Sequence, residues 1–107
     1  MSSKLTKESF EAETKEGTSL IKFEADWCGP CKKMTEILSE VEKDVTGVKF
    51  FTVDVDAEPE LTKNFGIRGI PFTLKVVNGE TVDSITGVQE IATIKKFILG
   101  NIEGEIA

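Results

Sequence analysis

The hydrophobic positions of this chain follow a helical period in some segments and a strand-like pattern in others. Between Pro30 and Val45 apolar side chains recur every three or four residues with Lys and Glu between them, and Gly47 follows as a stop. This segment is the clearest predicted helix; its apolar positions are Met34, Leu38, Val41 and Val45. Val48 to Val55 is rich in Val and Phe and predicts a buried strand, and Leu20 to Ala25 predicts a strand before the helix.

Three shorter helices are predicted elsewhere. Thr6 is a suitable N-cap for a first helix that ends near Gly17. Pro59 is well placed in the first turn of a second helix, which ends at Gly66. From about Glu90 to Leu99, Ile residues form one stripe of a last helix that we expect to pack on a sheet.

A hairpin completes the pattern. Asn78-Gly79 is a strong two-residue turn signal, so the strands Phe72 to Val77 and Thr81 to Thr86 are predicted to be antiparallel. The earlier strand, helix, strand segment instead implies a parallel pair with a right-handed connection. The sequence therefore predicts an α/β fold with a mixed sheet and helices on both faces.

Size and charge limit the possible functions. The chain has 107 residues and a mass of 11.7 kDa, which fits one domain over residues 1–107. A formal charge of −6 disfavours direct binding to nucleic acid. The longest apolar run, Phe97 to Leu99, is far shorter than the roughly 20 residues of a bilayer span, and Met1 to Lys4 lack a secretory signal. We therefore expect a cytoplasmic protein with no membrane partner.

The types of residue present restrict the chemistry further. The chain has no His and no Tyr, so it lacks the usual general base of hydrolases and the usual ligand of catalytic zinc. Its two cysteines, Cys28 and Cys31, lie where the predicted strand ends and the long helix begins. The unpaired N–H groups and the positive dipole at a helix start favour a thiolate, which is the form that attacks disulfides.

The spacing of the two cysteines suits thiol-disulfide exchange. We predict Cys28, expected at the exposed edge, to be the nucleophile, and Cys31 to resolve a mixed disulfide from within the same helical turn. Pro30 fixes the first turn of the helix, and Gly29 leaves room for a docking substrate. A purely structural disulfide would constrain the unfolded chain by only about 2 kcal/mol. A zinc site would need carboxylates or a second chain, so we expect no metal.

Nearly the whole sequence resembles the thioredoxin family. Three signatures carry the likeness, in the family's order and at its spacing: Trp27-Cys28-Gly29-Pro30-Cys31-Lys32, then Phe65-Gly66-Ile67-Arg68-Gly69-Ile70-Pro71, then Asn78-Gly79 followed by Gly87. The resemblance implies a thioredoxin fold, with a mixed five-stranded central sheet flanked by four helices. It also implies a cis peptide bond before Pro71 and a monomer.

The same resemblance implies a function and a surface. The expected activity is reduction of protein disulfides through a reversible Cys28-Cys31 disulfide, with no bound cofactor. The expected partners are disulfide-containing substrate proteins and a thioredoxin reductase. The implied apolar docking surface consists of Trp27, Gly29, Pro30, Ile70, Pro71, Gly87 and Val88, and the backbone of Ile70 would pair with the substrate chain.

One departure from the family affects the expected chemistry. Thioredoxins usually carry a buried Asp that accepts a proton from the resolving cysteine, and this chain has Lys22 at that position, with Glu24 on the same strand face. If Lys22 approaches Cys31, its charge should favour thiolate, weaken the reductant and slow the resolving step. The two charges would also neutralise one another. Alternatively, Lys22 extends to solvent and leaves the thiols unaffected.

Two other functions remain open at this level. Some thioredoxins act as binding or scaffold subunits, for example as processivity partners of a polymerase, and use the docking surface without redox turnover. An oxidant or isomerase is a further alternative, which depends on the reduction potential.

Overall fold

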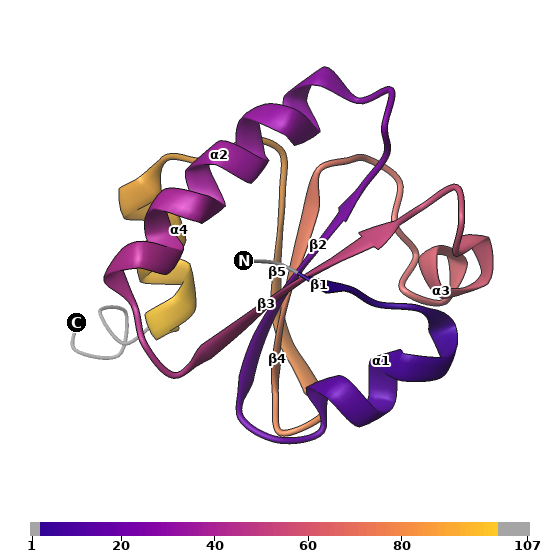
Figure 1. Cartoon of the computed structure of the whole chain (residues 1–107), viewed down its shortest axis with the longest axis horizontal. Helices are drawn as coiled ribbons and strands as arrows, with labels where there is room; N and C mark the ends of the chain where they lie inside the picture. The colour runs from indigo at the N-terminus through magenta and orange to yellow at the C-terminus, as the bar shows by residue number, and fades with distance from the viewer. Residues whose placement is uncertain (1–2, 101–107) are drawn as a thin grey trace.

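The computed structural model describes residues 3–100, which form one mixed sheet with two helices on each face (Figure 1). The strands are β1 (Ser3–Lys4), β2 (Thr18–Glu24), β3 (Val48–Asp54), β4 (Phe72–Val77) and β5 (Glu80–Thr86). The helices are α1 (Lys7–Thr14), α2 (Gly29–Asp44), α3 (Pro59–Asn64) and α4 (Ile91–Leu99). Within these residues no helix combines the length and the apolar composition that crossing a membrane requires.

The strand order is β1, β3, β2, β4, β5, which places β2 at the centre of the sheet. The β1 and β3 strands are parallel, as are β3 and β2, because α2 crosses over between β2 and β3. The β4 strand is antiparallel to both β2 and β5. The β2 strand lies between β3 and β4, which explains why five of its seven residues, Ser19 to Phe23, are buried.

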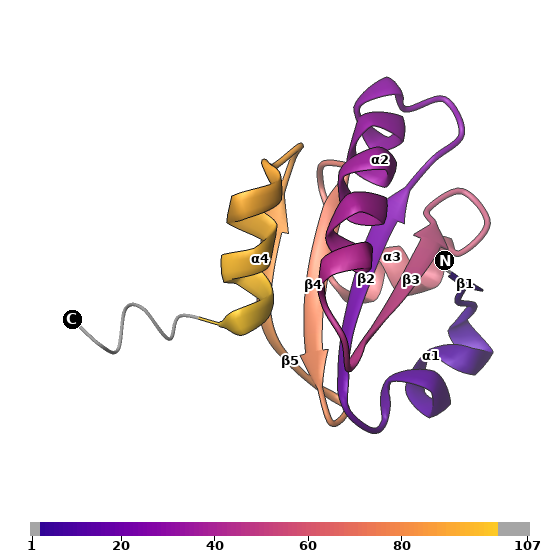
Figure 2. The ribbon, with the colours of Figure 1, turned by 60° about the vertical axis from the view of Figure 1, so that its left-hand side comes forward.

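Each face of the sheet has its own apolar core. The helices α2 and α4 cover one face and bury Met34, Leu38, Val41, Ile94 and Ile98 against Leu20 and Phe50 (Figure 2). The helices α1 and α3 cover the opposite face, where Phe10 and Leu61 pack with Phe23 and Val53 (Figure 1). The predicted mixed sheet with helices on both faces is confirmed.

The hairpin between β4 and β5 has the predicted form. Asn78 and Gly79 have φ values of 51° and 85°, and Val77 pairs with Glu80 across the two-residue loop. Positive φ at both central residues is the geometry of a type I′ turn, which Asn-Gly accommodates with little strain. Asn78 also joins the hairpin to the loop before β2, because its Oδ1 accepts from the Gly17 N–H at 2.8 Å.

Most predicted element boundaries are within two residues of those observed. The Thr6 cap is confirmed, since its Oγ1 accepts from the Ser9 N–H at 3.1 Å and the Thr6 N–H donates to Ser9 Oγ at 2.9 Å. The β1 strand, with only two residues, has no counterpart among the strands predicted from the hydrophobic pattern. Two residues are too few to show strand alternation, so only the resemblance implied a fifth strand.

Candidate active site

The two cysteines form a disulfide at the start of α2. Their Cα atoms are 5.3 Å apart. Cys28 is the N-cap residue of α2, and its Sγ accepts from the Cys31 N–H at 3.1 Å. The sulfur therefore lies where the free N–H groups and the dipole of the longest helix stabilise negative charge. The predicted position of Cys28 at a helix start is confirmed.

The prediction that Cys28 lies at an exposed edge is wrong, because Cys28 is buried. Cys28 is 4% exposed and Cys31 is 1% exposed, so both cysteines are buried in the disulfide form. The cover comes from Ala25, Val55 and Ile70, which pack around the disulfide. Cys28 is the more exposed of the two, and its neighbours Trp27, Gly29 and Pro30 are all exposed.

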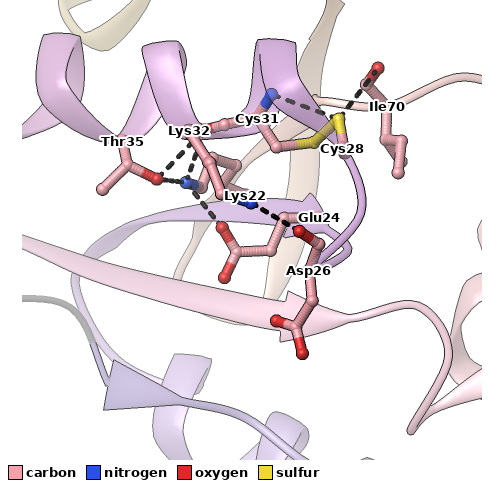
Figure 3. A network of polar contacts seen from close by, with 8 residues as sticks. All are labelled: Lys22, Glu24, Asp26, Cys28, Cys31, Lys32, Thr35 and Ile70. Carbon is pink, nitrogen blue, oxygen red and sulfur yellow. Dashed lines mark hydrogen bonds and ion pairs between the residues drawn. A yellow bond between two sulfur atoms is a disulfide. The ribbon is translucent and has the colours of Figure 1, made fainter.

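The loop before β4 lies against the sulfur of Cys28. The Ile70-Pro71 peptide bond is cis, as the resemblance implied, and the Ile70 carbonyl oxygen lies 4.0 Å from Cys28 Sγ (Figure 3). The Gly87 N–H donates to the Pro71 carbonyl at 2.7 Å and fixes this loop to the end of β5. The Ile70 backbone therefore has a defined place beside Cys28.

The predicted docking residues differ in what they expose. Trp27 is 71% exposed and Val88 is also exposed, whereas Ile70 and Gly87 are half-buried. Pro71 is fully buried, so its ring adds no surface for docking. The Trp27 indole N–H donates to Asp56 Oδ2 at 2.8 Å, which orients an otherwise free aromatic side chain. Sequence reasoning missed Asp56, because nothing in the pattern links the residues after β3 to Trp27.

Lys22 is buried under the first turns of α2 and does not extend to solvent. It is 1% exposed, and its Nζ forms an ion pair with Glu24 Oε1 at 2.6 Å. The same Nζ donates to the Cys31 carbonyl at 3.3 Å and to Thr35 Oγ1 (Figure 3). The expected mutual neutralisation of Lys22 and Glu24 is confirmed, and the contact to Cys31 is made to its backbone. Thr35, one helical turn after Cys31, is a member of this site that the sequence reasoning did not find.

A row of polar residues crosses the sheet at Lys22. Thr52 on β3 and Thr73 on β4 pair directly with Lys22 on either side, so the three side chains share the face covered by α2. Thr73 is fully buried, and its Oγ1 makes no hydrogen bond within residues 3–100. An unpaired buried hydroxyl costs stability, because it has lost its hydrogen bonds to water.

Replacing Thr73→Val is expected to raise the free energy of unfolding by about 1 kcal/mol, because a methyl group avoids the desolvation penalty of the hydroxyl. Urea denaturation would measure the change. Thr14→Val is the matched control, since Thr14 is also buried but its Oγ1 donates to the Phe10 carbonyl at 2.9 Å. The free energy of unfolding of that variant should fall by about 1 kcal/mol. Equal effects of the two substitutions would contradict the assignment of Thr73 Oγ1 as a buried hydroxyl without a hydrogen-bond partner among the described residues.

The residues around the disulfide provide no evident metal site. No group of three or more Cys, Asp and Glu side chains within residues 3–100 is placed to hold an ion. The chemistry-bearing feature of this region is the Cys28-Cys31 disulfide at the start of α2.

Comparison with known proteins identifies the family. The sequence model of the thioredoxin family matches residues 1–100. This chain belongs to the thioredoxin family. It is 35% identical to the thioredoxin of Rickettsia bellii over 105 residues, which cover 95% of this chain and 100% of that protein. With the thioredoxin of Bacillus subtilis the identity is 34%, over 89% of this chain and 92% of the relative.

Solved structures of thioredoxins have the same fold. The oxidised mitochondrial thioredoxin 3 of Saccharomyces cerevisiae superimposes with a TM-score of 0.85 at 29% identity, covering 92% of this chain and 93% of the other. Malassezia sympodialis thioredoxin superimposes with a TM-score of 0.80 at 26% identity, over 92% and 89% of the two chains. Family membership and the Cys28-Cys31 disulfide together make this thioredoxin a thiol-disulfide oxidoreductase, and they do not favour the scaffold alternative.

Proposed function

We propose that this thioredoxin reduces disulfide bonds in other proteins. The observation that carries the proposal is the position of Cys28 as the N-cap of α2, where its Sγ accepts a backbone N–H bond and belongs to the more exposed of the two cysteines. That environment favours the thiolate that attacks a disulfide. The electrons are held by the cysteine pair itself, so the reaction needs no bound cofactor.

The reaction consists of two exchanges. The Cys28 thiolate attacks one sulfur of the substrate disulfide, the substrate S–S bond breaks, and the second substrate sulfur leaves as a thiolate. Cys31, once deprotonated, then attacks Cys28 Sγ, which breaks the bond between Cys28 and the first substrate sulfur, releases that sulfur as a thiolate and regenerates the internal disulfide. The substrate gains two electrons and the dithiol loses two. Because Lys22 stands where the family carries a proton-accepting Asp, we propose that the second exchange is slow.

The surface around Cys28 is suited to binding an extended substrate chain. In this proposal the docking surface consists of the exposed residues Trp27, Gly29, Pro30 and Val88 together with the half-buried Ile70 and Gly87. In this proposal the Ile70 backbone pairs with the substrate, and Pro71 shapes the loop from below. A monomer would act on protein disulfides and be reduced again by a thioredoxin reductase in the reducing cytoplasm.

The test is reduction of insulin with dithiothreitol as the electron source. The wild-type protein should accelerate insulin precipitation over dithiothreitol alone. The double variant Cys28→Ser, Cys31→Ser should give only the rate with dithiothreitol alone, while circular dichroism shows that it keeps its fold. Equal acceleration by the two proteins would exclude disulfide exchange and would support a scaffold that works without its thiols.

A further inference from the structure

The unusual feature of this site is a buried ammonium group that contacts the backbone of Cys31 under the first turns of α2. Lys22 lies on the central strand β2, and its side chain is covered by α2. A buried charge is costly unless it is paired and hydrogen-bonded, and Lys22 has both compensations. Its carboxylate partner Glu24 has a side chain that is 23% exposed, against 2% for that of Lys22. The pair therefore extends from the partly exposed end of β2 to the interior.

The Lys22 ammonium group is hydrogen-bonded to the backbone of Cys31, the residue that carries the resolving sulfur. Lys22 Nζ donates to the Cys31 carbonyl at 3.3 Å and to Thr35 Oγ1, and Thr35 Oγ1 itself donates to the same carbonyl at 3.0 Å (Figure 3). Two side-chain donors thus converge on one peptide oxygen in the first turns of α2, and they also contact each other. This arrangement fixes the position of the positive charge relative to both sulfurs.

Glu24 is the counter-charge of Lys22. Within residues 3–100 its carboxylate contacts Lys22 and neither cysteine. The charge in contact with the cysteine backbone is therefore the positive one. A second nearby cation, Lys32, donates to the Asp26 carbonyl at the outer side of the loop (Figure 3).

We propose that Lys22, Glu24 and Thr35 form a redox-tuning centre in which the Lys22 ammonium group stabilises the reduced dithiol and Glu24 offsets part of that effect. All three are positioning residues in this scheme. The disulfide carries no charge, whereas the reduced form carries a thiolate that a neighbouring cation stabilises. The ammonium group therefore raises the reduction potential and makes the protein a weaker reductant. The inference rests on the proposed function for its biological meaning.

The equilibrium that reports this effect is exchange with glutathione. Two glutathione thiols donate two electrons, the Cys28-Cys31 bond breaks, and a glutathione disulfide forms as the protein becomes a dithiol. The oxidised fraction of the protein at a set ratio of glutathione to its disulfide gives the equilibrium constant. It should be measured at a pH at which the attacking thiol is ionised.

Lys22→Met, which keeps most of the unbranched side chain and removes its charge, should lower the equilibrium constant for reduction by about tenfold, or about 30 mV. Glu24→Gln should shift the constant in the opposite direction, by a few-fold. Lys95→Met is the matched control, because Lys95 pairs with Asp44 Oδ2 at 2.9 Å at the far end of α2. That variant should leave the constant unchanged.

Lys22→Gln separates charge from hydrogen bonding, because its amide can still donate a hydrogen bond. It should shift the constant in the same direction as Lys22→Met; a wild-type value would overturn the electrostatic assignment. An unchanged or higher constant for Lys22→Met would overturn the proposal, and a constant at or below wild type for Glu24→Gln would overturn the role given to Glu24. No protein substrate enters this measurement, so its outcome is independent of whether insulin is reduced.

Discussion

Replacing Cys31→Ser is expected to leave the protein covalently attached to its substrate. Cys28 can still attack a disulfide, but no second thiol is present to displace the substrate from its sulfur. Intramolecular attack by a well-placed group has an effective concentration far above that of any external thiol, so its loss should lengthen the life of the mixed disulfide by at least about a thousandfold. Non-reducing electrophoresis of the variant after incubation with insulin, followed by mass spectrometry of the adduct, would measure this lifetime.

The Cys28→Ser variant is the control that shows which of the two sulfurs attacks the substrate. Cys28→Ser leaves only Cys31, which is 1% exposed and lies beneath its neighbour. This variant should form little adduct, because a partner disulfide cannot reach the buried sulfur. Comparable amounts of adduct from both variants would mean that the two cysteines are equally accessible, and the assignment of Cys28 as nucleophile would fail.

The position of the site could be predicted from the sequence because it depends on local features. A predicted strand end at Ala25, a Pro in the next turn and a helical stripe from Met34 onward fix the start of α2 to within one residue. The two cysteines lie at that start, so their place in the fold follows from the helix boundary. The N-cap bond from the Cys31 N–H to Cys28 Sγ is a consequence of the same boundary.

The surroundings of the site could not be predicted in this way, because they depend on contacts between distant segments. Cys28 is buried by Ile70, which is 42 residues away along the chain, and Trp27 is oriented by Asp56. Whether Lys22 is buried or extends to solvent could not be predicted for the same reason. A lysine on a strand extends to solvent or remains inside according to what covers it, and here α2 provides a carbonyl and a hydroxyl as acceptors.

The largest effect on stability is expected from Phe23→Ala. Phe23 is fully buried on β2, and its ring centroid lies 5.8 Å from that of Phe65 and 6.3 Å from that of Phe72. Removing the ring leaves a cavity between the sheet and the α1 and α3 side, so the free energy of unfolding should fall by about 4 kcal/mol. Urea denaturation measures the loss, and Val82→Ala on the exposed strand β5 should change it by less than about 0.5 kcal/mol.

The same variant separates packing from the chemistry of the dithiol. Phe23 follows Lys22 directly, and neighbouring residues of a strand point to opposite faces of the sheet. The cavity therefore opens on the face covered by α1 and α3, opposite the face of Lys22, and the glutathione equilibrium of the folded Phe23→Ala variant should stay within about twofold of wild type, since no charge near the sulfurs has changed. A fall of less than about 1 kcal/mol in the free energy of unfolding would mean that neighbouring side chains fill the cavity. A large shift in the equilibrium at normal stability would instead mean that the two faces of the sheet are coupled through β2.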